Sequence, residues 1–158
     1  MERVLPAPAA TDLLGEQLAQ SIPGAVVVYL VGDLGAGKST LARALLRSLG
    51  VVGTIKSPTY TLVERYPLAD GEAVHLDLYR VAAAGELEFL GLDELRGQAR
   101  LWLVEWPERG GSALPPPDLR ISLEVTGAGR QANLLASTAM GQAWLAALSK
   151  NAAPGGSA

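Results

Sequence analysis

The sequence predicts an α/β fold, in which a mixed sheet has helices on its faces and antiparallel strands added at one side. Two apolar runs, at 25–31 and 100–106, have the length and composition of strands buried on both faces. The first run leads through a glycine-rich turn into leucines at helical spacing, which is the strand–turn–helix order of an α/β unit. Alternating apolar residues over 119–125, followed by a glycine-containing turn, predict the added antiparallel strands.

The N-terminal part of the chain is predicted to form a helix, a strand and a second helix. Thr11 and Asp12 offer side-chain oxygens that cap the start of a helix running to about residue 20, and a Pro-Gly pair ends it. The strand at 25–31 follows. The second helix carries its leucines on one face, and Gly50 ends it in the left-handed conformation.

The middle of the chain is predicted to form a hairpin. Residues 59–66 and 73–79 are strand-like and flank an Asp-Gly pair at 70–71, which is typical of hairpin turns. In the second of these strands, apolar residues alternate with polar ones that include His75 and Asp77. One face of that strand is therefore expected to be apolar and the other polar.

The remaining predicted elements are a helix over 86–95, a stiff proline connector over 115–117 and a final helix over 138–148. Residues 1–150 are expected to form a single domain, because the chain of 158 residues suits one compact unit. The small and polar residues of 151–158 are expected to form a disordered tail.

The composition excludes several classes of site. The chain has no cysteine and only one histidine, His75, which excludes disulfides, thiolate metal sites and histidine clusters. The net charge of −3 disfavours tight direct binding of nucleic acid, although docking onto a protein that holds RNA is compatible with it. No apolar run is long enough to span a bilayer, and the N-terminus lacks a signal-peptide pattern. We therefore expect no membrane association and a cytoplasmic location.

The glycine-rich turn at 32–39 matches the phosphate-binding pattern G-x-x-x-x-G-K-S/T. Its glycines let the backbone wrap closely and point N–H groups at phosphates, and the following helix adds its positive end. Lys38 is expected to reach the β and γ phosphates, and the Ser39 hydroxyl to bind Mg2+. The sequence therefore predicts a site for a nucleoside triphosphate with Mg2+.

Two carboxylates are candidates for the acidic partner that such a loop needs at the end of a second strand. Glu105 follows four apolar residues, and Asp77 lies on the polar face of its strand. The residues leave open which of the two contacts Mg2+ and which orients the attacking water or senses the γ-phosphate. Arg80 follows Asp77 and is interpreted as an ion-pair partner rather than an arginine finger. The hydroxyl-rich segment 57–61 is placed where many nucleotide switches keep a mobile segment.

The absence of other motifs limits which nucleotide and which type of reaction the sequence favours. The sequence has no N-K-x-D run, with which GTPases recognise guanine, and this favours ATP. It has no L-S-G-G-Q run, which disfavours a transporter-type ATPase. The chain is too short for a helical lid domain, and no arginine cluster is evident, so a kinase of small substrates is disfavoured.

Four segments in this order resemble the TsaE family (formerly YjeE), the small P-loop ATPases of bacterial tRNA threonylcarbamoyladenosine synthesis. They are GDLGAGKST, SPTYTLVERY, HLDLYR and LWLVEWPERG. The likeness extends from near Thr11 to the end of the last hairpin. It implies a three-layer P-loop NTPase fold and an enzyme that hydrolyses ATP weakly when alone.

The resemblance also implies partners. Family members work with the TsaD and TsaB proteins, which place a threonylcarbamoyl group on the adenosine next to the anticodon. The family protein does not carry out the transfer. Its ATP binding and hydrolysis reset the complex between turnovers, so that tRNA is met only indirectly, through the complex.

Site residues carry over from the family motif by position. Phosphate binding is carried over to Gly35, Ala36, Gly37, Lys38, Ser39 and Thr40. The resemblance assigns Mg2+ to Ser39 and Glu105, and makes Asp77 the second essential acid. Trp106 is matched to a residue close to the nucleotide, Thr11 to one near the base, and Arg130 to a nucleotide contact. One departure is Ser39, where the family often has threonine, and the hydroxyl chemistry is the same.

Two other functions fit a phosphate loop of this kind. The first is a small-molecule phosphotransferase, which would pass phosphate rapidly to a metabolite without a protein partner. The second is a nucleotide-dependent binding switch with negligible turnover.

Overall fold

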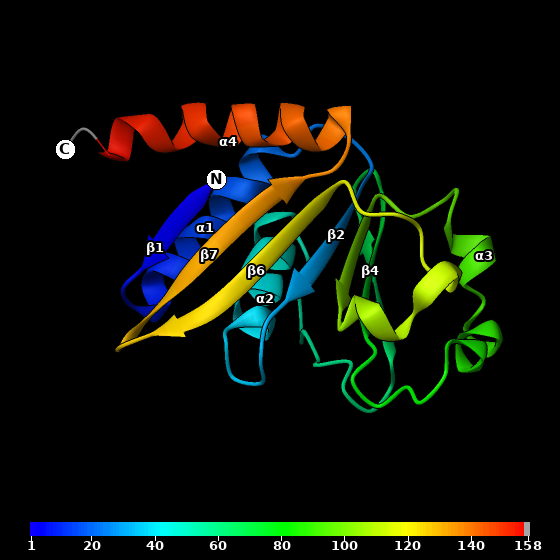
Figure 1. Ribbon diagram of the computed structural model, residues 1–158. Coiled ribbons are helices and arrows are strands. Elements are labelled where there is room, and N and C mark those ends of the chain that lie inside the picture. Colours follow the sequence, from blue (N-terminus) through cyan, green and yellow to red (C-terminus); the bar gives the residue numbers. More distant parts are fainter. Residues whose placement is uncertain (157–158) are drawn as a thin grey trace.

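The computed structural model describes residues 1–156, which form a seven-stranded mixed sheet with helices packed against it (Figure 1). The strands are β1 (Glu2–Leu5), β2 (Val26–Val31), β3 (Val63–Leu68), β4 (Gly71–Asp77), β5 (Leu101–Glu105), β6 (Leu119–Thr126) and β7 (Gly129–Ala136). The helices are α1 (Pro8–Ser21), α2 (Lys38–Ser48), α3 (Leu92–Leu95) and α4 (Ala139–Gly156). Three short 3-10 segments are η1 (Ala84–Leu90), η2 (Pro107–Arg109) and η3 (Gly111–Ala113).

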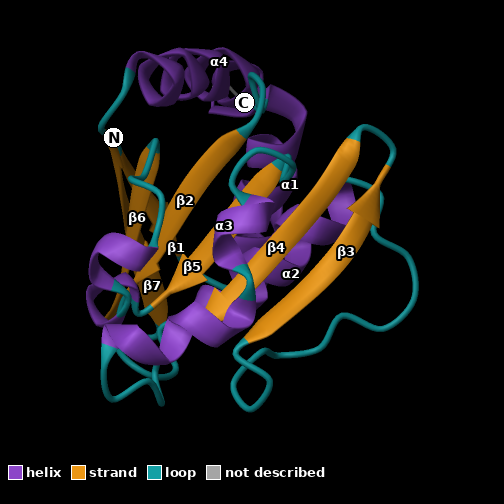
Figure 2. Cartoon of the chain, turned by 90° about the vertical axis from the view of Figure 1, so that its right-hand side faces the viewer, coloured by secondary structure: helices purple, strands orange, loops and turns teal. Residues whose placement is uncertain are grey.

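The middle of the sheet is parallel, and antiparallel strands are added to it. The strand order is β1-β7-β6-β2-β5-β4-β3. The pairs β2–β5, β2–β6 and β4–β5 are parallel, whereas β3–β4, β6–β7 and β1–β7 are antiparallel. The predicted α/β fold with a mixed sheet is confirmed, and antiparallel pairing occurs at both ends of the sheet (Figure 2).

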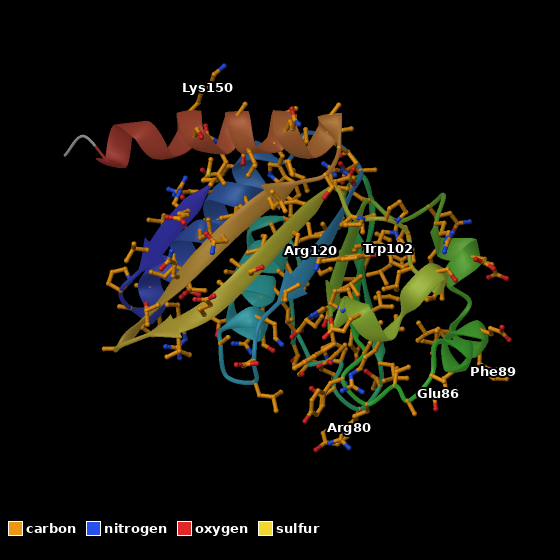
Figure 3. The ribbon with its side chains drawn as sticks, viewed as in Figure 1. Arg80, Glu86, Phe89, Trp102, Arg120 and Lys150 are labelled. Carbon is orange, nitrogen blue, oxygen red and sulfur yellow. The ribbon has the colours of Figure 1, made fainter. Side chains whose placement is uncertain are left out.

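The two faces of the sheet are covered by different elements. Because side chains alternate along a strand, Val28 and Leu30 of β2 pack into one core with α1 and α2, which lie behind the sheet in Figure 1. Tyr29 of the same strand packs into a second core. This second core includes Trp102 of β5 and is covered by η1, α3 and residues near η3 (Figure 3). The sheet is thus the middle layer of three over β2, β4 and β5.

Most of the predicted elements are present. The strands expected at 25–31 and 100–106 are β2 and β5, and the helix after the glycine-rich turn is α2, with Gly50 beyond its end at φ 104°. The hairpin predicted around residues 70–71 joins β3 to β4, and the glycine turn after the alternating strand joins β6 to β7.

Three sequence-based expectations were wrong in detail, and one strand was not predicted. The helix expected over 86–95 is two pieces, η1 and α3, because Gly91 between them has φ 68°, outside the helical region. The first helix starts at Pro8, because proline suits the first helical turn, and Thr11 therefore lies inside the helix rather than capping it. The strand expected to begin at 59 begins at Val63. The N-terminal strand β1, which pairs with β7, was not predicted.

The C-terminal helix is longer than expected. It was predicted to end near 148, and α4 extends to Gly156. Of the tail expected to be disordered over 151–158, residues 151–156 belong to α4, and residues 157 and 158 lie outside the described residues. None of the helices within residues 1–156 has the length and apolar character that a membrane span requires.

The contact between α1 and α2 depends on a glycine. A Cβ atom added to Gly15 would lie 2.5 Å from the Cβ atom of Ala44 and 3.0 Å from the backbone nitrogen of Leu45. We expect Gly15→Ala to lower the free energy of unfolding by about 1–3 kcal/mol, since overpacking outweighs the helix propensity that alanine gains. Urea denaturation measures this change. Gly97→Ala, where a Cβ atom meets nothing within 4 Å, is the matched control. A Gly15→Ala protein as stable as the wild type would contradict the expectation.

Candidate functional site

The glycine-rich turn lies where β2 ends and α2 begins. β5 and β6 flank β2 on opposite sides, so that the turn is at the point where the strand order reverses, the usual place of a ligand in an open α/β sheet. Gly35 and Gly37 have φ of 81° and 108°, in the left-handed region that side chains disfavour. Gly37 is the N-cap of α2, so that the free N–H groups of the first helical turn face the loop.

Lys38, the first residue of α2, lies almost buried in this loop and is only 5% exposed. Its Nζ donates to the carbonyl oxygen of Gly32 and lies 4.1 Å from the ring centroid of Trp106. Burial lowers the pKa of Lys38, and nearby carboxylates, with Glu105 and Asp77 contributing most, oppose this shift. The lysine charge is therefore held under low hydration, beside the space that a phosphate would enter.

The two candidate carboxylates are neighbours in the sheet. Asp77 of β4 and Glu105 of β5 are register partners, and both are buried. Ala73 of β4 and Leu103 of β5, at even spacing from them, belong to the core beneath α2. By alternation, both carboxylates lie on the α2 face of the sheet, the face that carries the phosphate loop. The polar face of β4 is therefore buried and forms part of the site.

Asp77 is tied to the hydroxyl-rich loop 57–61. The Thr59 hydroxyl donates to Oδ2 of Asp77 at 3.2 Å, and the Ser57 and Thr59 hydroxyls are 2.7 Å apart. Oδ1 of Asp77 accepts from the backbone nitrogen of Tyr79 at 3.0 Å. The backbone N–H of Asp77 donates to the carbonyl of Leu62, where the loop joins β3. A movement of this loop therefore changes the environment of the Asp77 carboxylate directly.

Glu105 is paired with His75, which lies on the same face of the sheet. The Nε2 atom of His75 is 2.7 Å from Oε2 of Glu105, and both side chains are 3% exposed. His75 was predicted to lie on a polar strand face and to be packed or hydrogen-bonded rather than catalytic, without a named partner. Its pairing with Glu105 joins residues 30 positions apart in the sequence.

Backbone strain marks the borders of the site. Within the described residues, Leu62 and Trp106 are the non-glycine residues with positive φ, at 69° and 57°. Such strain is found where the surrounding structure holds a residue in place, often at a functional site. The turn at Trp106 puts its ring over Lys38, with the Tyr79 ring 5.0 Å away.

Thr11, Thr40 and Arg130 meet on the other side of the loop. Together with Pro8 and Gly37 they line a cavity of about 140 Å³ between the start of α1, the start of α2 and the β6–β7 hairpin. The Nη2 atom of Arg130 donates to the carbonyl of Gly35 at 3.2 Å, which ties the hairpin to the phosphate loop. This cavity is adjacent to the loop.

The sequence profile of the family "Threonylcarbamoyl adenosine biosynthesis protein TsaE" matches residues 5–132 of this chain. The match includes the phosphate loop, both carboxylates, β6 and the first half of β7. The chain belongs to the TsaE family. Membership places it among the proteins of tRNA threonylcarbamoyladenosine biosynthesis.

Individual TsaE proteins are similar over most of their length. The "tRNA threonylcarbamoyladenosine biosynthesis protein TsaE" of Haemophilus influenzae is 43% identical over 125 residues, covering 79% of this chain and 79% of that protein. The protein of the same name from Synechocystis is 44% identical over 113 residues, which cover 69% and 71%. The crystal structure of YdiB from Bacillus subtilis superposes with a TM-score of 0.80 at 26% identity, covering 96% of this chain and 95% of that one.

The donor atoms of this TsaE chain suit Mg2+. Ser39 offers a hydroxyl, and Asp77 and Glu105 offer carboxylates, all of them hard oxygen ligands. Within residues 1–156, no group of three or more histidine, cysteine, aspartate or glutamate side chains forms a protein cage for a metal. Mg2+ is ordinarily held by one or two carboxylates together with phosphates and water, so a site of this type fits it.

Two clusters of the predicted residues thus converge on the loop. Lys38, Asp77, Glu105 and Trp106 lie on its inner side, and Thr11, Thr40 and Arg130 lie around the adjacent cavity.

Arg80 does not join these clusters. It is exposed, extends away from the domain and stacks on the ring of Tyr60 at 4.5 Å (Figure 3). The ion pair expected for Arg80 is absent from the interactions of residues 1–156. Sequence reasoning missed Pro8 at the cavity wall, because the first helix was expected to start near Thr11 rather than at Pro8.

Proposed function

We propose that this TsaE protein binds ATP with Mg2+ at the loop 32–39 and hydrolyses it to reset the TsaD–TsaB transferase complex between turnovers. The observation that carries the proposal is the arrangement of Lys38, Asp77 and Glu105, which lie on one face of the sheet around a phosphate loop. Family membership supports the tRNA-modifying context. The absence of a guanine-recognition run favours ATP over GTP.

In this proposal, the loop and Lys38 bind the phosphates. Backbone N–H groups of residues 35–40 donate to phosphate oxygens, and the Lys38 ammonium group leaves the Gly32 carbonyl to contact the γ-phosphate. Ser39 and Glu105 hold Mg2+, which, when bound, supplies positive charge against the phosphate oxygens. The adjacent cavity takes the nucleoside, with Thr11 and Arg130 at its walls.

Asp77 orients the attacking water in the proposed reaction. Its carboxylate already accepts hydrogen bonds from Thr59 and from the Tyr79 backbone, which hold it in place. The water oxygen bonds to the γ-phosphorus, the bond from that phosphorus to the bridging oxygen of ADP breaks, and the water protons leave with the inorganic phosphate or pass to solvent. Thr59 belongs to the loop 57–61. Presence or loss of the γ-phosphate therefore changes the conformation of this largely exposed loop, and a protein partner that binds the loop responds to that change.

The test is the rate of ATP hydrolysis by the chain alone and with purified TsaD and TsaB proteins. We expect slow hydrolysis alone and a clear increase with the complex, together with ATP-dependent capture of the chain by the complex in a pull-down. Equal and negligible turnover in both conditions would favour a binding switch. Rapid phosphate transfer to a metabolite without partners would favour a phosphotransferase. Lack of association in every nucleotide state would contradict the role in resetting the complex.

A further inference from the structure

The only histidine of the chain is buried beside a proposed metal ligand. His75 lies in β4 between two core residues, and its side chain is 3% exposed. Its Nε2 atom is 2.7 Å from Oε2 of Glu105, a carboxylate that is buried to the same extent. An ionised carboxylate can only accept hydrogen bonds, so Nε2 is the donor in this pair.

The hydrogen bond between Nε2 and Glu105 is the single hydrogen bond that the His75 side chain makes within residues 1–156. Nδ1 of His75 is buried and has no hydrogen-bond partner in residues 1–156. Leaving a buried polar atom unpaired is unfavourable, and an apolar side chain would fill the same space without that disadvantage. The donor that His75 presents to Glu105 is therefore what distinguishes it from an apolar residue at this position.

The hydrogen bond from His75 also makes the two carboxylate oxygens of Glu105 differ in their hydrogen bonding. Oε2 is held by His75, whereas Oε1 accepts no hydrogen bond from the described residues. A glutamate side chain has several rotatable bonds, and a hydrogen bond to one oxygen restricts the direction of the other. Ser39, at the start of α2 on the same face of the sheet, supplies the second proposed ligand.

We propose that His75 is a positioning residue, whose Nε2–H donor holds Oε2 of Glu105 so that Oε1 is directed to Mg2+. This inference rests on the proposed function and extends it to a residue that does not touch the nucleotide. It predicts that His75 sets the Mg2+ requirement of the site while leaving nucleotide binding without Mg2+ intact.

Three substitutions of His75 separate positioning from packing. His75→Gln keeps an N–H donor at about the reach of Nε2. His75→Asn moves the donor back to about the position of Nδ1, and His75→Leu removes it. Isothermal titration calorimetry with ATP in EDTA gives the affinity for ATP without Mg2+. Repeating the titration over a series of MgCl2 concentrations gives the Mg2+ concentration at which half of the Mg2+-dependent increase in ATP affinity is reached.

For His75→Leu and His75→Asn we expect that Mg2+ concentration to rise by about 10- to 100-fold, the usual effect of losing a partner of a metal ligand. The affinity in EDTA is expected to stay within about twofold of the wild type, and His75→Gln to recover most of the Mg2+ response. In a Glu105→Gln background, His75→Leu is expected to cause no further change, because the carboxylate through which it acts is gone.

The outcomes distinguish this inference from the function on which it rests. An unchanged Mg2+ response in the leucine and asparagine variants, or a glutamine variant as poor as leucine, would overturn the positioning role alone. Equal losses of affinity with and without Mg2+ would instead indicate a purely structural role. If His75→Leu does not fold, the difference in Mg2+ response between His75→Asn and His75→Gln decides whether His75 positions Glu105. A wild-type protein whose ATP affinity does not respond to Mg2+ would overturn the proposed function, and this inference with it.

Discussion

Replacing Lys38 with alanine is expected to weaken ATP binding by about 10- to 100-fold and to reduce hydrolysis by about 100-fold or more. A hydrogen bond to a charged group contributes roughly 1.5–3 kcal/mol, and removing a charge-stabilising donor from an active site reduces turnover by about 10²–10³. Lys38 is the buried cation of the loop, and its Nζ contacts the Gly32 carbonyl and the Trp106 ring. Lys38→Ala therefore removes the positively charged side chain that the loop offers to the phosphates.

Calorimetric titration with ATP and a phosphate-release assay measure both effects of Lys38→Ala. Because Trp106 lies against Lys38 while the other two tryptophans are buried in the cores, tryptophan fluorescence gives a second binding signal. Lys150→Ala is the matched control, since Lys150 is exposed on α4 (Figure 3). Wild-type binding and hydrolysis by Lys38→Ala would show that the loop is not the nucleotide site.

The isosteric substitutions Glu105→Gln and Asp77→Asn are each expected to reduce hydrolysis by about 10²–10³-fold, for different reasons. Glu105→Gln removes a charged Mg2+ ligand, so the gain in ATP affinity that Mg2+ gives should fall with it. Asp77→Asn removes the group proposed to orient water, so hydrolysis should fall while Mg2+·ATP still binds with nearly wild-type affinity. Titrations at several MgCl2 concentrations, combined with single-turnover hydrolysis, separate the two roles.

Glu108→Gln is the carboxylate control for this pair. Glu108 is exposed in η2 and acts on Lys38 only through its charge. We expect it to change hydrolysis by less than about threefold, as is usual for screened surface charges. If Asp77→Asn lost the Mg2+ response while Glu105→Gln kept it, the two assignments would be exchanged.

Local sequence was sufficient to predict the elements that form the phosphate loop. The apolar run of β2, the glycines at 35 and 37 and the leucines of α2 each follow rules that operate within a few residues, and the structure contains all three. The strand that ends in Glu105 was predicted for the same reason. The motifs also predicted the family, because the matched segments lie in one order along the chain.

The tertiary structure alone decided how the remaining groups meet. Asp77 and Glu105 become neighbours through the parallel pairing of β4 with β5, and the same pairing buries the strand face that the alternation had only shown to be polar. The bonds from His75 to Glu105, from Thr59 to Asp77 and from Arg130 to Gly35 join residues 30, 18 and 95 positions apart.

The physical reason for this division is the range of the forces involved. Backbone conformation and hydrophobic periodicity depend on neighbours in the chain, so the sequence by itself determined the loop, its strand and its helix. Strand order, register and burial depend on contacts between distant segments. Only the folded chain therefore decided that a single histidine holds Glu105 and that α1 and the last hairpin close a cavity beside the loop.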